Sequence, residues 1–283
     1  MLVLAELVDF FTACGENSAS LVTRSEAILS KLEDEHQSRL LTFMESVHRH
    51  GQISINMRPT VLLTFLTSGT LLNIHQWAES ILKRSRKTKN AILKDKLGDY
   101  YFRRMAFDLY FRGGDAFQYG ALIVGGLGLE RYGEYCAIFS LAKLQLTSGV
   151  GYLASDSLRT YVSSKASLDG ERIRTECACD THKHFLACVK LASKICSAPE
   201  MYWNRCLCSD DDYIEAIIGG QVTPDAVRSI RIAKTDYLLY WEYAFNEFAG
   251  KLSELDRFRV DTFARIDDNL ARFGLTWEPV TDA

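Results

Sequence analysis

Apolar side chains recur at helical spacing through most of the first hundred residues. Between residues 25 and 51 the stripe consists of Ile28, Leu29, Leu32, Leu40, Met44 and Val47. Positions three and four apart share one helix face, so this stretch is predicted to be helical and to end at Gly51. Another helix is expected between Pro59 and Gly69, because proline favours the first helical position and glycine the end of a helix.

After residue 110 the pattern changes to short apolar runs separated by glycine. We predict strands over residues 117–124 and 135–139, which are rich in aromatic and aliphatic side chains. The segment between them, GGLGLERYG, contains Glu130 and Arg131 and lacks the Lys-Ser/Thr pair of a mononucleotide-binding loop. We interpret it as the loop of a β-hairpin. A glycine backbone that approaches a ligand closely is the alternative.

The stretch DDYIEAIIGGQVTPDAVRSIRI predicts a strand, a turn, a short helical segment and a second strand. Gly219-Gly220 permits a sharp exit from the first strand, and Pro224 favours a helical start. Side chains alternate between the faces of a strand, so Tyr213, Glu215 and Ile217 are expected on one face. A carboxylate in so apolar a strand either faces solvent and discourages edge pairing or is a catalytic or ligand-binding group on a rigid element.

Helices at both ends and strands in the middle indicate an α+β fold. Its central mixed or antiparallel β-rich core is expected to be flanked by N-terminal and C-terminal helices. We divide the chain into a helical region over residues 1–110, a β-rich core over residues 111–233 and C-terminal helices over residues 234–283. No clear linker separates these regions, so we expect one compact unit.

Composition supports a folded chain, since 47% of the 283 residues are hydrophobic, which is enough for a sizeable core. The first twenty residues include Glu6 and Asp9 and lack a basic start, so they make a poor secretory signal. No run of about 18 apolar residues is present to span a bilayer. Eight cysteines in such a chain indicate reduced thiols. We therefore expect a cytoplasmic protein, and delivery as an effector stays open.

Charge changes this picture only locally. The formal net charge of −3 does not require a nucleic-acid partner, but lysine and arginine are concentrated from Lys83 to Lys96. We interpret this section as a solvated face, because acidic residues elsewhere balance it and no aromatic side chains interleave with it. A weak polyanion-binding patch is the alternative.

Soft metal ligands gather in the segment CACDTHKH, which contains Cys177, Cys179, His182 and His184. Their spacing is C-x-C and H-x-H, whereas structural zinc sites usually carry cysteines two to four residues apart. Cysteine is also a good buried hydrophobic residue. We therefore do not expect bound zinc, and these four residues are the candidates if the chain does hold a metal.

The segment YIEAIIGGQVTPDAVRSIRI resembles the carboxylate strand of ADP-ribosyltransferase-like proteins of the bacterial toxin or effector type. In many of these proteins a strand carries the catalytic glutamate, and a short turn, a helical turn and another strand follow. Glu215 takes the place of that glutamate. The segment LYFRGG resembles the Tyr-Arg-Gly form of the family's first motif and makes Arg112 its candidate. YGEYCAIFSL and YLASDSL resemble a strand-and-loop pair of toxin-like members.

The resemblance covers only the central segment, and two positions depart from it. Tyr213 stands where many arginine-modifying members carry Glu or Gln, two residues before the glutamate. Ser155-Asp156-Ser157 is only a loose stand-in for the Ser-Thr-Ser motif of that type.

The resemblance implies that NAD is the substrate and that ADP-ribose is transferred to a macromolecular target, a protein or a nucleic acid. Glu215 would then be the catalytic residue, stabilising positive charge on the ribose as the nicotinamide–ribose bond loosens. Arg112 would hold the phosphates or ribose of NAD. One of the three tyrosines of this region would stack on nicotinamide: Tyr119, Tyr132 or Tyr135.

Other interpretations stay open. The chain would be a non-enzymatic interaction protein or a degenerate member of the same fold, or a zinc-stabilised binding domain. An interaction protein would expose the aromatic stripe of its C-terminal helix, which consists of Tyr237, Tyr240, Trp241, Phe245 and Phe248. We expect this stripe in the core instead, because aromatic residues at helical spacing usually bury.

Overall fold

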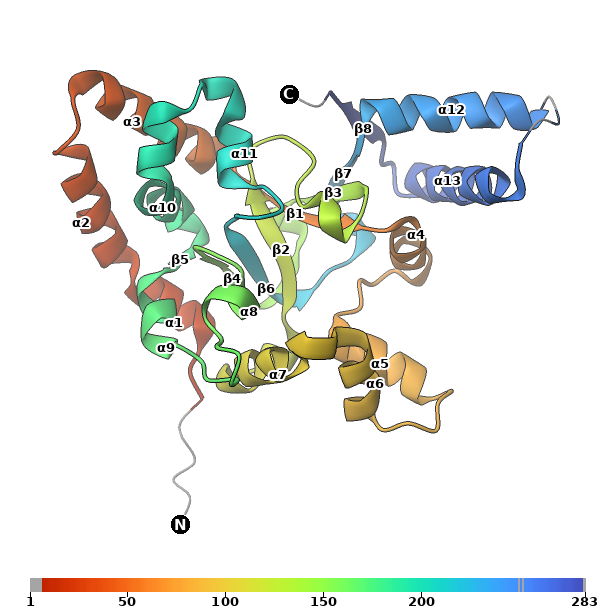
Figure 1. The fold of residues 1–283 in the computed structure, drawn as a ribbon, viewed down its shortest axis with the longest axis horizontal. Helices are drawn as coiled ribbons and strands as arrows, with labels where there is room; N and C mark the ends of the chain where they lie inside the picture. The colour runs from red at the N-terminus through yellow and green to blue at the C-terminus, as the bar shows by residue number, and fades with distance from the viewer. Residues whose placement is uncertain (1–6, 249, 251, 282–283) are drawn as a thin grey trace, which may run out of the picture.

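The computed structural model describes residues 7–248, 250 and 252–281. It is an α+β protein in which a central mixed sheet is flanked by helices at both ends of the chain, as predicted (Figure 1). The strands are β1 (Gln52–Met57), β2 (Gln118–Ile123), β3 (Tyr135–Phe139), β4 (Gln145–Leu153), β5 (Cys177–Cys179), β6 (Glu215–Gln221), β7 (Val227–Ala233) and β8 (Trp277–Val280).

Helices precede, interrupt and follow these strands. The α-helices are α1 (Phe10–Glu16), α2 (Ser18–Leu29), α3 (Asp34–His50), α4 (Pro59–Ser68), α5 (Ile74–Leu82), α6 (Lys89–Leu97), α7 (Tyr101–Tyr110), α8 (Ser157–Thr160), α9 (Gly170–Thr175), α10 (Lys183–Ser197), α11 (Trp203–Leu207), α12 (Lys234–Phe248) and α13 (Glu254–Arg272). Short 3₁₀ turns used below are η1 (Gly98–Tyr100), η3 (Glu130–Tyr132) and η7 (Pro224–Ala226). Among the described helices, none is long and apolar enough to cross a membrane.

The strands form one sheet in the order β5-β4-β6-β2-β1-β3-β7-β8. Neighbouring strands are antiparallel apart from β7 and β8, which run parallel. The sheet is therefore mixed, and β1 and β2 lie at its centre.

The central position of β1 corrects two expectations. The helical region predicted over residues 1–110 contains this strand, and the predicted hairpin between β2 and β3 does not form, because β1 pairs with both of them. The glycine-rich loop therefore crosses over β1. A Cβ on Gly128 would lie 2.4 Å from the Asn56 Oδ1 of β1, so glycine is required for this close approach.

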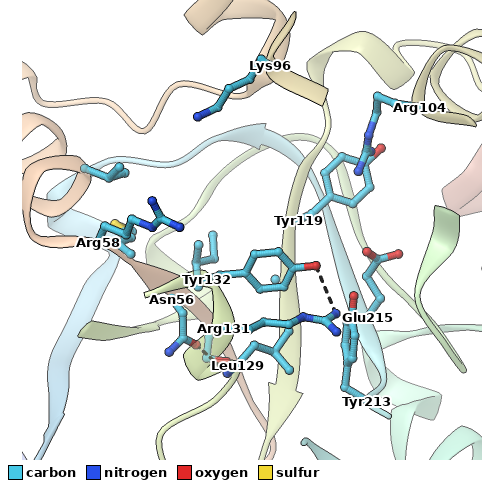
Figure 2. Close-up of a pocket in the computed structure, with 15 residues that line it drawn as sticks. Asn56, Arg58, Lys96, Arg104, Tyr119, Leu129, Arg131, Tyr132, Tyr213 and Glu215 are labelled. Atoms are coloured by element: carbon cyan, nitrogen blue, oxygen red, sulfur yellow. Dashed lines mark hydrogen bonds between the residues drawn. The ribbon is translucent and has the colours of Figure 1, made fainter. Parts of the chain in front are cut away.

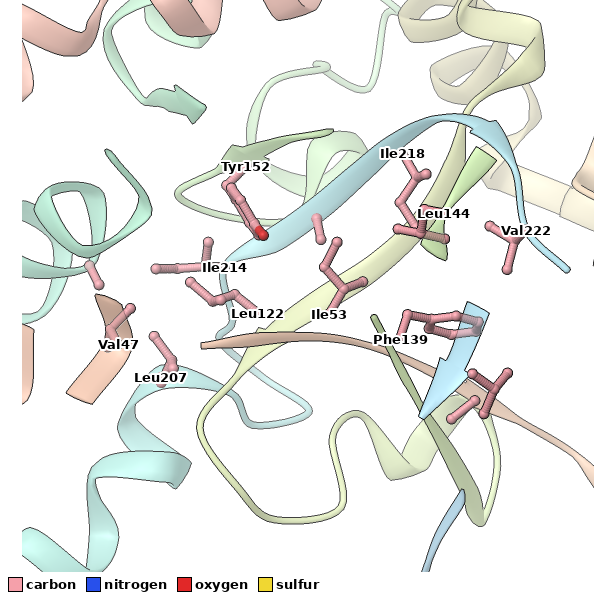
Figure 3. Packing of buried hydrophobic residues seen from close by; sticks show 14 of the residues in the cluster. Val47, Ile53, Leu122, Phe139, Leu144, Tyr152, Leu207, Ile214, Ile218 and Val222 are labelled. Carbon is pink, nitrogen blue, oxygen red and sulfur yellow. The ribbon is translucent and has the colours of Figure 1, made fainter. Parts of the chain in front are cut away.

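The two faces of the sheet have different roles. Ile214, Ala216 and Ile218 belong to the large core against α3, α4, α10 and α13, whose packing Figure 3 shows from close by. Ile217 packs into a second cluster with α1 and α7 on the other face. The alternation predicted for β6 is therefore confirmed, and Glu215 shares its face with Ile217.

The unit that follows Glu215 also has the predicted order, since β6, η7 and β7 succeed one another. The expected sharp exit at Gly219-Gly220 is wrong, because both residues continue β6 to Gln221. A Cβ on Gly220 would lie 2.3 Å from the carbonyl oxygen of Gln145 on β4. This glycine allows close strand approach rather than a turn.

Helices α12 and α13 form a hairpin that projects from the edge of the sheet at β7 and β8 (Figure 1). The connection between the two helices contains Gly250, which has a positive φ of 69°. Helix α13 packs along α4 and so connects the hairpin to the body of the protein.

Candidate functional site

A cavity of about 470 Å³ opens on the face of the sheet that carries Glu215. The sheet supplies its floor, because Glu215 on β6 stands opposite Ala121 on β2, and Ala121 stands opposite Ser54 on β1. The small side chains of Ala121 and Ser54 leave space where larger residues would fill the surface. Most side chains around this space are charged or aromatic (Figure 2): Arg58, Lys96, Arg104, Arg131, Glu215, Tyr119, Tyr132 and Tyr213.

Glu215 is only 5% exposed and opens β6. The backbone amide of Ser157 donates to its Oε2 across 2.8 Å. Burial, reinforced by the charge of Asp156, raises the pKa of Glu215 to about 8, although Arg104 and Ser157 act in the opposite direction. A carboxyl with this pKa is mostly protonated at pH 7, and an additional cation beside it would favour its ionised form.

Arg104 and Tyr119 form the wall beside Glu215 and share one anchor, Asp108. The Tyr119 hydroxyl donates to Asp108 across 2.8 Å, and the Arg104 guanidinium lies 3.9 Å from the centre of the Tyr119 ring. Asp108 also contacts His75 Nε2 at 2.7 Å. Burial opposes the Arg104 charge, but Tyr119 and Asp108 raise its pKa above the ordinary range. This buried group fixes a cation and an aromatic ring beside the carboxyl.

The opposite wall comes from the glycine-rich loop. Asn56 on β1 accepts a hydrogen bond from the Leu129 amide and donates to the carbonyls of Leu127 and Gly133. The side chain of Asn56 thereby holds the loop closed over the strand. The closed loop places η3 at the cavity, so that Arg131 and Tyr132 line it.

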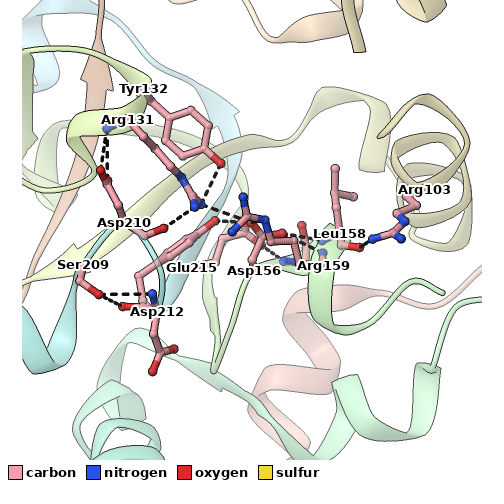
Figure 4. Close-up of polar contacts among 12 residues, drawn as sticks. Arg103, Arg131, Tyr132, Asp156, Leu158, Arg159, Ser209, Asp210, Asp212 and Glu215 are labelled. Atoms are coloured by element: carbon pink, nitrogen blue, oxygen red, sulfur yellow. Dashed lines mark hydrogen bonds and ion pairs between the residues drawn. The ribbon is translucent and has the colours of Figure 1, made fainter. Parts of the chain in front are cut away.

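Arg131 is tied to the loop that precedes β6, through Asp210 (Figure 4). Its backbone amide donates to the Asp210 carboxylate, and its guanidinium donates to the Asp210 carbonyl. The guanidinium also lies 4.7 Å from the centre of the Tyr132 ring and 5.3 Å from that of Tyr213. Arg131 is therefore held between two tyrosines.

Asp156 connects this wall with Glu215. Its carboxylate accepts from the Tyr213 hydroxyl at 2.9 Å, lies 3.5 Å from Arg131, and caps the start of α8. The residue that follows, Ser157, donates its amide to Glu215. The Ser155-Asp156-Ser157 segment, expected as a loose stand-in for a family motif, thus lies in contact with the candidate catalytic residue.

Two cationic side chains at the rim of the cavity are not paired with acidic side chains of the described chain. Arg58, directly after β1, and Lys96, at the end of α6, are both exposed and line the cavity. Within the described part of the chain, neither makes an ion pair with an acidic side chain. Lys96 instead lies 5.3 Å from the Trp77 ring centre. The rim therefore offers positive charge to an anionic ligand.

No protein-family model and no curated protein matches this chain.

The structure brings three of the five expected NAD-site residues together. Glu215, Tyr119 and Tyr132 all line the cavity, whereas Arg112 and Tyr135 do not. Arg112 follows the end of α7, is exposed, and donates its amide to the Val8 carbonyl. The LYFRGG segment is therefore a helix end rather than a strand, and the arginine that this helix supplies to the cavity is Arg104.

Tyr135 is excluded by strand alternation. It is only 1% exposed and lies on the opposite face of β3, where its ring centre is 5.4 Å from that of Trp277. Cys136 and Ile138 occupy the face that Tyr135 was expected to share with the cavity. The odd positions of β3 belong to the large core.

Of the four candidate metal ligands, the structure brings only Cys179 and His182 into contact. Cys177 is buried in β5, and Cys179 Sγ lies 3.2 Å from His182 Nδ1. His184 packs on His48 with ring centres 4.6 Å apart, and burial with the nearby His48 lowers the pKa of His184 to about 4. Across residues 7–248, 250 and 252–281, no three His, Cys, Asp or Glu side chains are arranged to hold a metal ion.

The C-terminal aromatic stripe divides between core and surface. The Tyr240 ring stacks on Phe263 at 4.5 Å, whereas Trp241 is 53% and Phe245 is 74% exposed. The expectation that the whole stripe is buried is therefore wrong. The side chain of Phe248 lies outside the described part of the protein.

The sequence analysis missed several residues of the site: Ser54, Asn56, Arg58, Arg104 and Asp108. Three of them belong to β1 or follow it directly. The segment QISINM carries an available signal, since apolar and polar residues alternate along it between Gly51 and Pro59. Arg104 and Asp108, one helical turn apart, share a face of α7.

Proposed function

We propose that this cavity binds NAD and that the protein transfers ADP-ribose from NAD to a macromolecular target. The observation that carries the proposal is the placement of Glu215. A buried carboxyl opens β6, an inner strand of the sheet, at the edge of a 470 Å³ cavity that is also lined by cations and tyrosines. A dinucleotide needs all three kinds of group, because it combines a pyrophosphate, aromatic rings and a ribose that becomes cationic in the reaction.

The distribution of charge suits such a ligand. Arg58 and Lys96 lie at the rim, away from Glu215, and are free to contact phosphate oxygens (Figure 2). The Tyr132 ring is 50% exposed and stands between the rim and Glu215, where a planar ring can stack on it. We assign phosphate binding to the two cations and ring stacking to Tyr132.

Glu215 would act on the bond between nicotinamide and ribose. When this bond breaks, its electron pair leaves with neutral nicotinamide, and positive charge develops on the ribose. A fixed carboxylate stabilises that charge most strongly where water is excluded. The nicotinamide ring of NAD is itself a cation, so its binding would lower the pKa of Glu215 toward ionisation. A nucleophile of the target then bonds to the ribose carbon and loses a proton to solvent.

Local structure supports the resemblance on which the expectation rests. A strand that begins at the glutamate, a 3₁₀ turn and a second strand succeed one another as β6, η7 and β7. Ser157 contacts Glu215, although Tyr213 replaces the expected Glu or Gln. Tyr213 donates its hydroxyl to Asp156, so this position supplies no carboxylate to act on the target that would receive ADP-ribose.

The direct test is nicotinamide release from NAD by the purified protein, with and without cell lysate as a source of target. Glu215→Gln keeps the size of the side chain and accepts the Ser157 amide, so it tests the charge alone. We expect release to fall at least about 100-fold in this variant. Glu171→Gln, on the exposed surface of α9, is the matched control and should retain full release.

Equal release by the wild type and Glu215→Gln, or none from a folded wild type supplied with lysate, would refute the proposal. Calorimetric titration with NAD then separates a cavity that binds without reacting from one that does not bind NAD.

The exposed hairpin face favours a second candidate, in which the chain is a non-enzymatic interaction protein. Trp241 and Phe245 on α12 are large apolar side chains that lie exposed to solvent. Exposed apolar side chains of this kind often mark a surface that binds a partner. In this case the Trp241→Ala/Phe245→Ala variant would lose the biological effect of the protein, and Glu215→Gln would retain it. The reverse pattern supports the transferase.

A further inference from the structure

Positive charge is concentrated in one segment beside the cavity. Residues 83–104 contain nine lysines and arginines against two aspartates, a net charge of +7 in a chain whose total is −3. This segment comprises the turn after α5, helix α6, the short η1 and the start of α7 (Figure 1). The rest of the chain is therefore strongly acidic, and the asymmetry marks this surface for polyanions.

The segment ends at the candidate site. Lys96 and Arg104 both line the cavity, and Arg104 stands beside Glu215 (Figure 2). Arg103, between them, donates to the carbonyl of Leu158 on α8, the helix whose first residue holds Glu215 (Figure 4). A ligand that follows the segment therefore reaches the mouth of the cavity.

Most of this charge is available. Lys87 and Lys89 pair with Asp95 and Glu79, but both pairs are exposed, and such pairs are weak and easily exchanged. In the part of the chain that the structure describes, Lys83, Arg84 and Arg86 form no ion pair with an acidic side chain. The protein does not neutralise this surface by itself.

Residues 83–96 contain no aromatic side chain, but the aromatic side chains that follow them lie beside the cations in the folded protein. Phe102 is 58% and Tyr100 is 41% exposed. The Lys94 ammonium lies 5.8 Å from the Phe102 ring centre, and the Arg103 guanidinium lies 5.9 Å from that of Tyr100. We call these four residues together with Lys96 the basic rim. Exposed rings beside cations are the combination with which proteins bind unpaired bases and their phosphates.

We propose that the basic rim binds single-stranded nucleic acid and leads it to the mouth of the cavity. The cations contact phosphates, and Phe102 and Tyr100 stack on bases. In a duplex the faces of the bases are stacked on one another. Only its phosphates would therefore contact the basic rim, through the lysines and arginine. An acidic protein would likewise leave the two rings without a specific role. An anionic membrane could take up both rings at the headgroup level, so the vesicle comparison in the test below separates it from nucleic acid. Binding needs no NAD and is therefore decided separately from the reaction proposed for the cavity.

The test is fluorescence anisotropy with a fluorescein-labelled 20-nucleotide oligo-dT or oligo-U, at 50 and 200 mM salt. We expect the affinity for either single strand to exceed that for a duplex of equal length and to fall with salt. Lys94→Ala/Lys96→Ala should weaken binding about tenfold and flatten the salt slope by about 1.4, near 0.7 for each lost phosphate contact. Phe102→Ala should weaken binding about tenfold with the slope unchanged.

Lys31→Ala/Lys143→Ala is the matched control, since it removes two exposed lysines outside the rim. All substituted residues are exposed or partly exposed, and circular dichroism confirms that the variants are folded. The proposal is overturned by absence of binding at 50 mM salt, or by equal losses in the rim and control variants. It is also overturned by tighter binding of the duplex, or of vesicles with one-third phosphatidylserine, than of the single strands.

Discussion

The Ser157 amide donates to the Glu215 carboxyl across 2.8 Å, in a place where the carboxyl is almost fully buried. One hydrogen bond at the start of α8 fixes one oxygen of Glu215 and leaves the other directed toward Arg104 and the cavity (Figure 2). Burial nevertheless raises its pKa to about 8. The protein thus holds an oriented acid that becomes a carboxylate mainly at alkaline pH, or when a cation in addition to Arg104 lies beside it.

Nicotinamide release should increase with pH. The carboxylate is the form that stabilises a cationic ribose, and its fraction in the free protein rises up to ten times per pH unit below about pH 8. We expect kcat/KM to rise between pH 6 and 8 and to level off above. The measurement is initial release at subsaturating NAD, corrected by Glu215→Gln at each pH. A flat profile would show that a group other than Glu215 controls the step.

Glu215 should cost the protein stability at neutral and alkaline pH. An ordinary glutamate ionises near pH 4.5, whereas the native Glu215 retains its proton up to about pH 8. Between these values the unfolded chain is ionised and the native protein is not, so the free energy of unfolding falls as pH rises. Glu215→Gln removes this loss and should gain about 2–4 kcal/mol relative to the wild type between pH 5 and pH 8.

Urea denaturation at both pH values measures this gain, and Glu171→Gln should show none. A stability difference between Glu215→Gln and the wild type that stays the same from pH 5 to pH 8 would mean that the carboxyl ionises as readily in the native protein as in the unfolded chain.

Asp108→Asn should destabilise the protein at every pH near neutrality. The Arg104 side chain, only 11% exposed, loses its ionised partner, while the amide still fills the space. Leaving a buried charge uncompensated costs about 3–5 kcal/mol. Asp95→Asn, which breaks an exposed pair with Lys87, should have little effect on the same urea midpoint. Comparable losses in both variants would contradict the anchoring role of Asp108.

Gly128→Ala should damage the cavity more than Gly125→Ala. Both glycines have positive φ, 69° and 85°, so each substitution strains the backbone. Only at position 128 would the new Cβ also collide with Asn56, at 2.4 Å, whereas position 125 has open space. We expect Gly128→Ala to displace Arg131 and Tyr132 and to weaken NAD binding at least tenfold. Calorimetry measures the affinities, and equal effects would show that Asn56 does not hold the loop.

The sequence predicts those parts of the fold that are determined locally. The alternation around Glu215, the 3₁₀ turn at Pro224 and the helix from Pro59 to Gly69 depend on neighbouring residues, and all three are confirmed. By contrast, β1 is only six residues long and lies between helices, so its pairing with strands far along the chain determines it. Because β1 is not predicted from the sequence, β2 and β3 are wrongly expected to pair with each other as a hairpin.

The same reason explains the site. Glu215 was recognisable because it is polar in an apolar strand. Arg104 enters the cavity through the packing of α7 against β2, and no local signal distinguishes it from Arg112, which is exposed. The face of β3 on which Tyr135 lies depends on the register of this strand with β1, so the short apolar sequence of β3 alone could not reveal that Tyr135 points into the core.

The place of β1 in the middle of the sheet also governs how the chain can fold. This early strand finds partners only when β2 and β3 have been made, and β6 must then return to lie beside β2. Such distant pairings close large loops before they stabilise anything, which makes folding slow. Until then the apolar face of β1 is uncovered, so we expect the newly made chain to be exposed to pairing of this strand with another molecule.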